Sequence, residues 1–402
     1  MFVFYFFAAI VIWLGILSLR GGLTFASYVR RETTTPPPNF MPFASVIAPN
    51  RGMDQGLREN IAALFKQNYP AYEIILVTDR AADPALPLMK EIADTDREPG
   101  RVSARVVIAG DAIDSGQKVH NLRAAVSEVD LRSEVLVFVD TDARPHAGWL
   151  KSLVAPLSDE NMGATTGYRW FIPLNGSLSS HLRSVWNASI ASALGGREDK
   201  NFCWGGSTAM RRSTFERLQI RERWRGTVSD DFTMTRVLGE ARLPIHFVPD
   251  CLVASVDNCT ARELIEFTNR QLKITRVYAP HLWKAVFIGS LLFNAVFFGG
   301  FALVVARAIL RLPYAIPLIL LFIIYALGTA KAYIRLKAVA IPLVSYQKHL
   351  GKSLPAHLFL WPIASLLFLC NAITAAFSRR LRWRGITYEL KSATEAVIIS
   401  RE

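Results

Sequence analysis

The sequence predicts an α/β domain with membrane-spanning helices before and after it. Four stretches without charged side chains are each long enough for a helix to cross about 30 Å of hydrocarbon. They cover residues 2–19, 285–306, 312–330 and 354–378. Between the first two, short β-rich runs alternate with helical patterns, which is typical of parallel strands joined by helical crossovers. The polar region is therefore predicted to be a globular domain held at a membrane.

Composition favours a membrane partner over nucleic acid. The chain has 402 residues, 51% of them hydrophobic, and a formal net charge of +13. A nucleic-acid-binding protein neutralises phosphates with basic patches, but here the basic residues crowd the flanks of the apolar stretches, as at Arg379, Arg380, Arg382 and Arg384. This placement favours contact with anionic lipid. The four cysteines lack metal-ligand spacing, which favours free thiols in a reducing compartment.

The first apolar stretch reads as an uncleaved anchor over residues 1–20. No basic region precedes it and no small-residue cleavage site follows it, so a signal peptide is disfavoured. Arg20, Arg30 and Arg31 come after it and predict a cytoplasmic carboxyl end. Residues 21–42 are expected to be a linker, because the prolines of "TTTPPPNFMP" (33–42) cannot continue a helix.

Residues 43–261 are the predicted globular domain. Four of its runs read as strands: "ASVIAPN" (44–50), "YEIILVTD" (72–79), "ARVVIAG" (104–110) and "VLVFVDTD" (135–142). In an open α/β sheet, ligands bind beyond the carboxyl ends of the strands. Polar residues stand at three of these ends: Asn50, Asp79, and the pair Asp140 and Asp142.

The carboxylates of Asp140 and Asp142 would repel each other at the end of an apolar run. An isolated Asp-x-Asp is most often a turn or a cap, and only Arg144 stands near enough in sequence to neutralise the pair. A divalent cation such as Mg²⁺ or Mn²⁺, bound through oxygen and bridging substrate phosphates, would resolve the repulsion. We therefore predict a metal site at Asp140 and Asp142.

The stretch "DSGQKVHNL" (114–122) places Ser115 and Gly116 before a helical pattern. Free backbone N–H groups at that helix start, together with Lys118, would form a cradle for a diphosphate. The alternative is a solvated lysine beside an ordinary helix cap.

The stretch "TVSDDFTMTRVL" (227–238) starts with a good N-cap, Ser229, followed by Asp230 and Asp231. Acids in a first turn stabilise the helix dipole, which is the structural alternative. A transfer to a hydroxyl group needs a carboxylate that accepts its proton. Asp231 is predicted to be that base, ahead of Asp230.

Two tryptophans and a series of basic residues are candidates for the acceptor and diphosphate side. Trp170 and Trp204 offer flat faces for sugar rings or lipid, although either could fill the core, and Arg169 could pair with phosphate. Residues 262–283 are predicted to form an interfacial amphipathic helix with Arg270, Lys273 and Arg276 near one face. Anchoring to lipid headgroups is the alternative role for these three.

The order of these motifs, over about residues 43–283, resembles that of family 2 and family 21 glycosyltransferases. The closest likeness is to the ceramide glucosyltransferase-like group with bacterial members. The resemblance implies a GT-A fold, nucleotide recognition by Asp79, metal and donor binding by Asp140 and Asp142, and a general base in the Asp230–Asp231 pair. The stretch "GQKVHNL" is similar to the family's lysine–asparagine motif and implies donor binding by Lys118 and Asn121.

The closing motif departs from the family pattern. That pattern is Gln or Arg, two residues, then Arg-Trp, whereas this chain has Arg270-Gln-Leu-Lys273-Ile274. The charge is retained and the tryptophan is not, which leaves the acceptor contact open. The basic tail, residues 379–402 with "LRWRGITYEL" (381–390), is expected to lie along the membrane surface.

Residues 284–378 are predicted to form a membrane domain with two spans and a third span or re-entrant segment. With a cytoplasmic catalytic domain, the two spans deliver Lys331, Arg335 and Lys337 to the cytoplasm. A third full crossing would carry the arginines of the tail outside, and Pro355 and Pro362 favour a re-entrant segment instead.

Together these features predict an inverting, metal-dependent transferase in the inner or plasma membrane. It would move a hexose from a nucleotide-diphosphate sugar, such as UDP-glucose, to the hydroxyl group of a ceramide-like or other membrane lipid. A processive polysaccharide synthase and a catalytically inactive nucleotide-sugar-binding protein are the alternatives.

Overall fold

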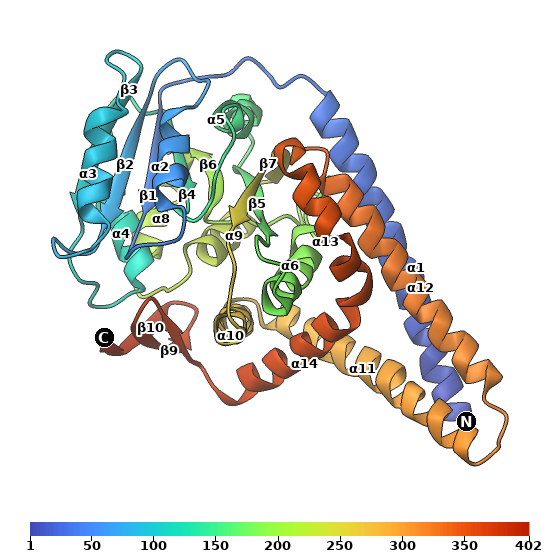
Figure 1. Ribbon diagram of the computed structural model, residues 1–402. Helices are drawn as coiled ribbons and strands as arrows, with labels where there is room; N and C mark the ends of the chain where they lie inside the picture. The colour runs from blue at the N-terminus through green and yellow to red at the C-terminus, as the bar shows by residue number, and fades with distance from the viewer. Residues whose placement is uncertain (402) are drawn as a thin grey trace. The chain divides into compact units, whose positions relative to one another are not determined.

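The computed structural model describes residues 1–401, which divide into two compact units (Figure 1). The first unit comprises residues 1–30, 173–192 and 258–378, and the second comprises residues 31–172, 193–257 and the chain from Arg379 onward. The predicted domain boundaries differ from this division at two places. Residues 173–192 belong to the unit with the long apolar helices, and the C-terminal tail belongs to the other.

The second unit is built on a seven-stranded mixed sheet with the order β3-β2-β1-β4-β6-β5-β7. The strands are β1 (Ala44–Pro49), β2 (Tyr72–Thr78), β3 (Val102–Ile108), β4 (Val135–Val139), β5 (Ala164–Ile172), β6 (Ser207–Arg211) and β7 (Ile245–Val256). β1 pairs in parallel with β2 and β4, and β2 pairs in parallel with β3, as the alternation of strands and helices predicts. β6 runs antiparallel to β4 and β5, which brings the region after residue 200 beside the acidic end of β4.

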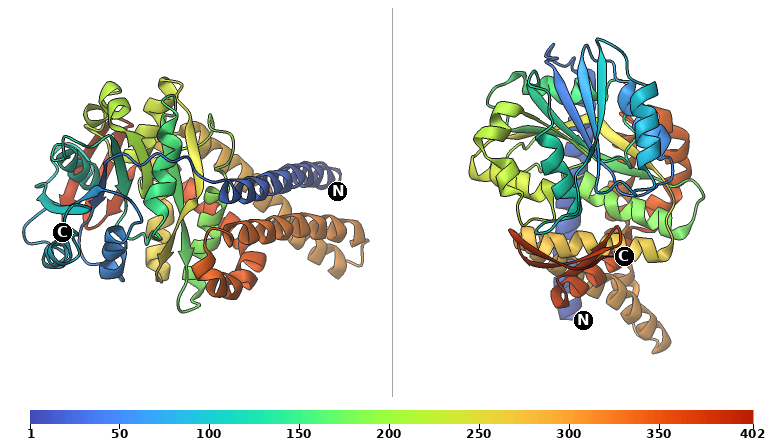
Figure 2. Two further views of the ribbon diagram at one scale, coloured as in Figure 1. Left: turned by 90° about the horizontal axis from the view of Figure 1, so that it is seen from above. Right: turned by 90° about the vertical axis from the view of Figure 1, so that its left-hand side faces the viewer.

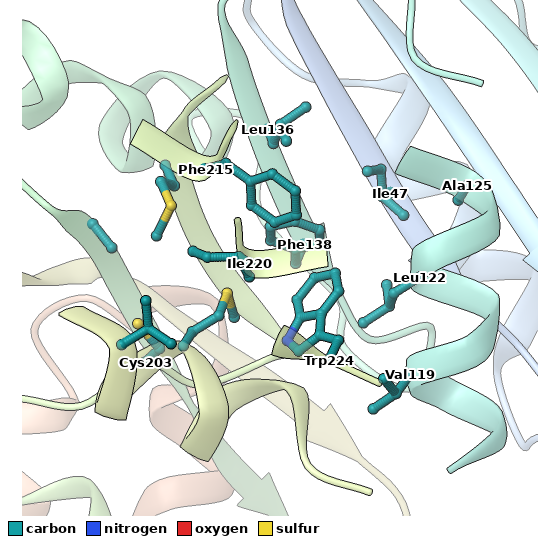
Figure 3. Close-up of a cluster of buried hydrophobic side chains, with 14 of the residues drawn as sticks. Ile47, Val119, Leu122, Ala125, Leu136, Phe138, Cys203, Phe215, Ile220 and Trp224 are labelled. Carbon is teal, nitrogen blue, oxygen red and sulfur yellow. The ribbon is translucent and has the colours of Figure 1, made fainter. Parts of the chain in front are cut away.

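Helices cover both faces of this sheet (Figure 2). They are α2 (Leu57–Phe65), α3 (Leu86–Thr95), α4 (Gln117–Val126), α5 (Trp149–Val154), η1 (Ala155–Ser158), α7 (Arg212–Arg217), α8 (Ile220–Arg223) and α9 (Asp230–Glu240). On one face, side chains of α4 and α7–α9 pack with the strands in a core that includes Ile47, Leu122, Phe138 and Trp224 (Figure 3). The rings of Phe138 and Trp224 meet edge to face with centroids 5.5 Å apart. This core fixes the starts of α4 and α9, where the charged residues described below stand.

The C-terminal segment, expected to lie along the membrane surface, is folded into a small sheet. It forms an antiparallel sheet of β8 (Arg380–Trp383), β9 (Ile386–Ser392) and β10 (Glu395–Arg401). Alternate residues, among them Leu381, Ile386, Tyr388 and Leu390, are buried. A half-buried sheet needs this period-two pattern. The chain near Gly226 passes so close to this sheet that an added Cβ would lie 2.1 Å from the Thr394 carbonyl oxygen.

The first unit holds the long apolar helices. Its elements are α1 (Phe2–Thr34, whose last residues enter the second unit), α6 (Leu178–Ala191), α10 (Ala261–Tyr278), α11 (Pro280–Ile309), α12 (Ala315–Val339), η2 (Val344–Tyr346), α13 (Gln347–Phe359) and α14 (Trp361–Phe377). Among the described residues, α1, α11 and α12 are long and apolar enough to cross a membrane. The helices from Val344 to Phe359 and from Trp361 to Phe377 bend by 69° at their break, which fits a broken span or a re-entrant loop. α1 continues through residues 21–34, so that part of the predicted linker is helical and only the proline run interrupts it.

Candidate active site

Five charged side chains from separate parts of the sequence meet at the carboxyl end of β4. Lys118, the second residue of α4, lies with its Nζ 2.8 Å from Asp140 Oδ1 and 3.2 Å from Asp230 Oδ1. Arg169 on β5 reaches the other side of the pair, with Nη2 2.9 Å from Asp140 Oδ2 and Nη1 2.9 Å from Asp142 Oδ2. The structure therefore joins three acidic positions that the sequence singled out, and it places Lys118 among them.

The two carboxylates after β4 are neutralised by Lys118 and Arg169, and the prediction that only Arg144 could do so is wrong. The Nε of Arg144 instead donates to Asn60 Oδ1 at 2.9 Å. Burial raises the pKa of Asp140, but Lys118 and Arg169 outweigh this effect and hold that pKa below its usual value. Burial lowers the pKa of Lys118, yet Asp140 and Asp230 raise it overall, so the ammonium group keeps its charge.

Asp230 and Asp231 are adjacent in sequence but stand in different environments. Asp230 is 2% exposed, and burial, with the nearby charges of Asp231 and Asp140, raises its pKa to about 6 despite Lys118. Asp231 is half-buried, and its carboxylate accepts hydrogen bonds from the Ser229 hydroxyl and, at 2.7 Å, from the Phe232 N–H. Ser229 is the N-cap of α9, as its position predicted. Of the two acids, Asp231 is the one that a substrate hydroxyl can approach.

Gly205 is required by the packing of this cluster. A Cβ added there would lie 2.1 Å from Asp230 Oδ2 and 2.8 Å from Lys118 Nζ. Both distances are far inside van der Waals contact, so a side chain would displace the Lys118–Asp230 pair. The backbone at Gly205 therefore passes directly beside the charged cluster.

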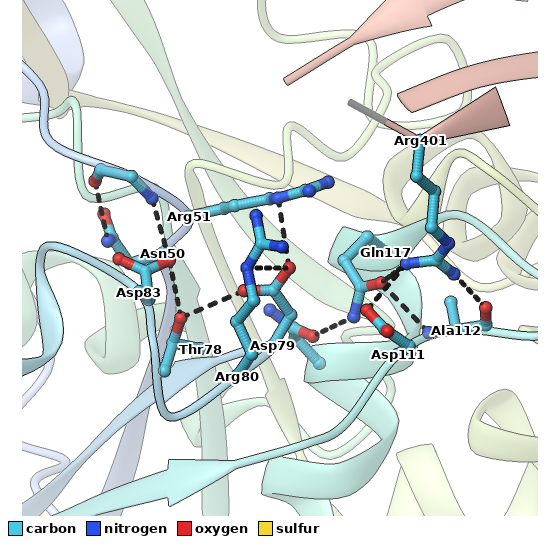
Figure 4. Close-up of polar contacts among 12 residues, drawn as sticks. Asn50, Arg51, Thr78, Asp79, Arg80, Asp83, Asp111, Ala112, Gln117 and Arg401 are labelled. Atoms are coloured by element: carbon cyan, nitrogen blue, oxygen red, sulfur yellow. Dashed lines mark hydrogen bonds and ion pairs between the residues drawn. The ribbon is translucent and has the colours of Figure 1, made fainter. Parts of the chain in front are cut away.

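Asp79 directly follows β2 and belongs to a separate network of polar contacts (Figure 4). Its side chain is fully buried, and its Oδ2 lies 3.0 Å from Arg51 Nε and 3.9 Å from Arg80 Nε. Beneath it, the Thr78 hydroxyl donates to Asp83 Oδ2 at 2.9 Å, and the same carboxylate oxygen accepts from Gly52 N–H at 2.9 Å. Asp79 is thus oriented by two arginines at the strand end where the sequence predicted nucleotide recognition.

The sequence predicted free N–H groups at the start of α4 that would hold a diphosphate. That prediction is wrong for Gly116 and Gln117, whose N–H groups already have partners. The Gly116 N–H donates to the Thr227 carbonyl at 2.8 Å, and the Gln117 N–H donates to the Tyr388 hydroxyl at 3.1 Å. Lys118 remains as the cationic group of this segment. Asn121 is 1% exposed and accepts a hydrogen bond from Gln117 Nε2 at 2.9 Å, so it supports the segment from within the helix.

The C-terminal sheet contributes to this region, which the sequence reasoning missed. Arg401 bonds to Asp111 Oδ1 at 2.7 Å and to Gln117 Oε1 at 3.2 Å (Figure 4). At the β8–β9 turn, Arg384 forms a two-pronged ion pair with Asp54. Burial lowers the pKa of Arg384, but the negative charges of Asp54, Asp142 and Asp140 raise it above its ordinary value. The positive charge of Arg384 in turn helps to lower the pKa of Asp140. A third cation therefore stands near the acids that follow β4.

Both tryptophans that were candidates for contact with a substrate are buried. Trp170 is 1% exposed, so it is a core residue and offers no face to a substrate. Trp204 is also buried, and its ring lies beneath the guanidinium of Arg169, whose Cζ is 4.9 Å from the ring centroid. Tyr168 packs beside it at 5.4 Å. Trp204 thus positions Arg169, which is the arginine that holds both acids after β4.

Arg270, Lys273 and Arg276 all lie on α10 in the first unit. α10 starts with the capping box of Thr260 and Glu263, and it ends shortly before Pro280 begins α11. Arg276 lies over the Trp283 ring at 5.5 Å and donates to the Ala375 carbonyl, which ties α10 to the neighbouring apolar helices. Burial lowers the pKa of Lys273.

The acids after β4 suit a divalent cation by their chemistry. Mg²⁺ and Mn²⁺ prefer carboxylate oxygen and usually take one or two protein carboxylates together with substrate phosphates. Asp142 is the more open of the two, with 38% of its side chain exposed against 19% for Asp140. No group of three or more His, Cys, Asp or Glu residues suited to a metal occurs within residues 1–401, so the remaining ligands would come from substrate or water.

In an open α/β sheet, charged residues gathered beyond the carboxyl ends of the strands mark the place where ligands bind. The chain belongs to glycosyl transferase family 21, whose family model matches residues 5–396. The α/β sheet and the long apolar helices expected from the sequence are both present.

Individual relatives are distant. The chain is 22% identical over 271 residues to ceramide glucosyltransferase 1 of Caenorhabditis elegans, covering 64% of this chain and 55% of the relative. It is 26% identical over 130 residues to ceramide glucosyltransferase 3 of the same organism, covering 31% of this chain and 27% of that relative. The chain thus spans about half the length of the first relative and about a quarter of the length of the second. Among solved structures, the mannosyltransferase PcManGT from Pyrobaculum calidifontis, in complex with GDP-Man and Mn²⁺, is similar with a TM-score of 0.48 and 19% identity, over 92% of this chain and 98% of that one.

Proposed function

We propose that the chain is an inverting hexosyltransferase that uses a nucleotide-diphosphate sugar as donor and a membrane lipid hydroxyl as acceptor. The observation that carries the proposal is the cluster of Asp140, Asp142, Lys118 and Asp231 at one edge of the sheet. It combines a region that can bind a diphosphate with a carboxylate that can accept a proton. Membership of family 21 supports sugar transfer, and the names of the two worm relatives support a ceramide-like acceptor and glucose as the sugar.

The donor would lie between the ends of β2 and β4. Asp79, oriented by Arg51, would accept hydrogen bonds from the base or ribose of the nucleotide. Lys118, Arg169 and Arg384 supply positive charge for the diphosphate. Asp140 and Asp142 would hold Mg²⁺ or Mn²⁺, which when bound neutralises the leaving diphosphate. Arg169 would exchange part of its pairing with these acids for phosphate oxygens.

The transfer would be a single displacement. The acceptor oxygen forms a bond to the anomeric carbon while the bond from that carbon to the diphosphate oxygen breaks. The hydroxyl proton passes to the carboxylate of Asp231, and the nucleoside diphosphate leaves. Asp230, paired with Lys118, is a positioning residue in this scheme. The lipid would come from the membrane, with the second unit on the cytoplasmic side.

The proposal is tested by nucleotide release. Membranes that contain the full chain are supplied with UDP-glucose, UDP-galactose or GDP-mannose and with lipid extract, and nucleoside diphosphate is measured with and without EDTA. We expect lipid-dependent release with one donor, lost with EDTA and restored by Mg²⁺ or Mn²⁺. Mass spectrometry should find a single added hexose per lipid. Polymer would favour the processive synthase, and donor binding without release from any lipid would favour an inactive binding protein.

Arg384 provides a more specific test of the donor side. Arg384→Gln is expected to raise the dissociation constant for the nucleoside diphosphate about tenfold, equal to about 1.4 kcal/mol, because one cation near the diphosphate is lost. Titration calorimetry of the detergent-purified protein measures it. Arg382→Gln, a matched change on exposed β8, should leave the constant unaltered. Equal constants for wild type and Arg384→Gln would remove Arg384 from the donor site.

A further inference from the structure

The first unit contains two neighbouring cations, a half-buried lysine and a buried arginine, that have no acidic partner among the described residues. Lys331 and Arg335 lie one turn apart on α12, and Arg335 is only 5% exposed. The Lys331 ammonium donates to the Ser18 hydroxyl of α1 at 2.6 Å. Within residues 1–401 neither side chain forms an ion pair with a carboxylate, and the buried Nε of Arg335 has no hydrogen-bond partner.

Two neighbouring positive charges, one buried and one half-buried, are stabilised by a compensating anion. Desolvating an ion costs several kcal/mol unless an opposite charge and hydrogen bonds offset it. Lys331 and Arg335 stand in the last turns of α12, where the helix dipole favours cations, but that effect is typically about 0.3–1 kcal/mol. The dipole is therefore too weak to stabilise both charges, and the two also repel each other.

The surroundings of these cations form a defined site. Gly22 on α1 makes room for the Lys331 stem, because an added Cβ would lie 3.3 Å from Lys331 Cγ. His357 on α13 is fully buried and close enough to Arg335 for their charges to interact. The His357 ring in turn lies 3.4 Å, through Nε2, from the Ser184 hydroxyl on α6. Groups from α1, α6 and α13 thus surround the end of α12.

The depth of the site indicates which anion it would bind. Lys331 directly follows the uncharged part of α12, residues 315–330, so the cations stand where this span would leave the hydrocarbon. Anionic lipid phosphates occupy that level of a bilayer. A guanidinium beside an ammonium is a suitable donor set for phosphate oxygens.

We propose that Lys331 and Arg335 bind the phosphate of an anionic membrane phospholipid between α1, α12 and α13. This site is separate from the acids and cations of the second unit. It does not depend on the sugar-transfer proposal, because its ligand is a lipid that is retained and not consumed.

The experiment compares lipid retention in the full chain. Protein is purified in detergent, exposed to phosphatidylglycerol or phosphatidylcholine, washed, and examined by native mass spectrometry and by thermal unfolding. We expect at least tenfold more retained phosphatidylglycerol than phosphatidylcholine, together with a higher unfolding temperature. The double variant Lys331→Gln and Arg335→Gln should lose this preference. Lys337→Gln, a change of an exposed lysine on the same helix, should keep it.

If the double variant does not fold, the lipid preference of the wild-type protein tests the proposal by itself. Equal retention of the two lipids by wild type would overturn the proposal, as would an unchanged preference in a folded double variant. If inorganic phosphate raises the unfolding temperature as much as phosphatidylglycerol does, the assignment of the site to a lipid is overturned. Arg335→Lys retains the charge and should keep most of the preference.

Discussion

Asp231→Asn is expected to lower turnover by about 10²–10⁴-fold, because the amide cannot accept the acceptor's proton. The substitution is nearly isosteric, and the amide oxygen can still accept hydrogen bonds from the Ser229 hydroxyl and the Phe232 N–H. Nucleotide binding should therefore change little. The measurement is the initial rate of nucleoside diphosphate release at saturating donor, paired with the dissociation constant for the same nucleotide.

Asp230→Asn is the matched control for this prediction. Asp230 is buried against Lys118 and is placed to organise the site. We expect a smaller loss of turnover there and a larger change in stability. A large loss in Asp230→Asn with near-normal turnover in Asp231→Asn would mean that the two roles are reversed.

Lys118→Met is expected to destabilise the second unit strongly. The change leaves Asp230 buried without its cation and Asp140 with Arg169 alone, and breaking a buried pair typically costs about 3–5 kcal/mol. Adding Asp230→Asn should recover part of the loss, because it removes the charge left without a partner. Unfolding in urea, followed by tryptophan fluorescence, measures both variants. Lys90→Met, on the exposed surface of α3, should have little effect.

The pH dependence of these variants has a definite sign. The folded-state pKa of Asp230 is about 6, above its ordinary value of 3.8, so the folded chain binds more protons than the unfolded chain between these two pH values. The contribution of Asp230 to the free energy of unfolding therefore falls as the pH rises from about 4 to about 6. Wild type should lose stability relative to Asp230→Asn over that window. A constant difference between the two would contradict the raised pKa.

Much of the sheet and part of the site follow from local patterns in the sequence. The uninterrupted apolar runs of β1, β2 and β4 identify buried parallel strands, and the rule that ligands lie beyond strand ends brings Asp79 and Asp140 to one edge. The adjacency of Asp140 and Asp230 was implied only by the family resemblance. Their shared contact with Lys118 depends on how α4 and α9 pack, which no local pattern encodes.

The contact of Arg169 with the acids after β4 and the C-terminal sheet were beyond the predictions for different reasons. Arg169 reaches the acids because β6 is inserted antiparallel between β4 and β5, and such a pairing of distant segments has no local signature. The C-terminal hairpin did carry a signal. Alternating apolar residues flank Arg384 and Gly385, which both have positive φ, as a tight two-residue hairpin turn requires. The prediction for this segment used its basic charge and did not use that alternation.

The order of segments along the chain has a consequence for biosynthesis. The unit that carries the charged cluster is assembled from three pieces, and the last of them, with Arg384, Tyr388 and Arg401, is translated only after the apolar helices α11 to α14. A ribosome-bound chain therefore cannot complete this unit until its membrane helices have been made. The second unit is completed last, after the apolar helices of the first have been made, so a truncated product that stops within the helices is incomplete in both units.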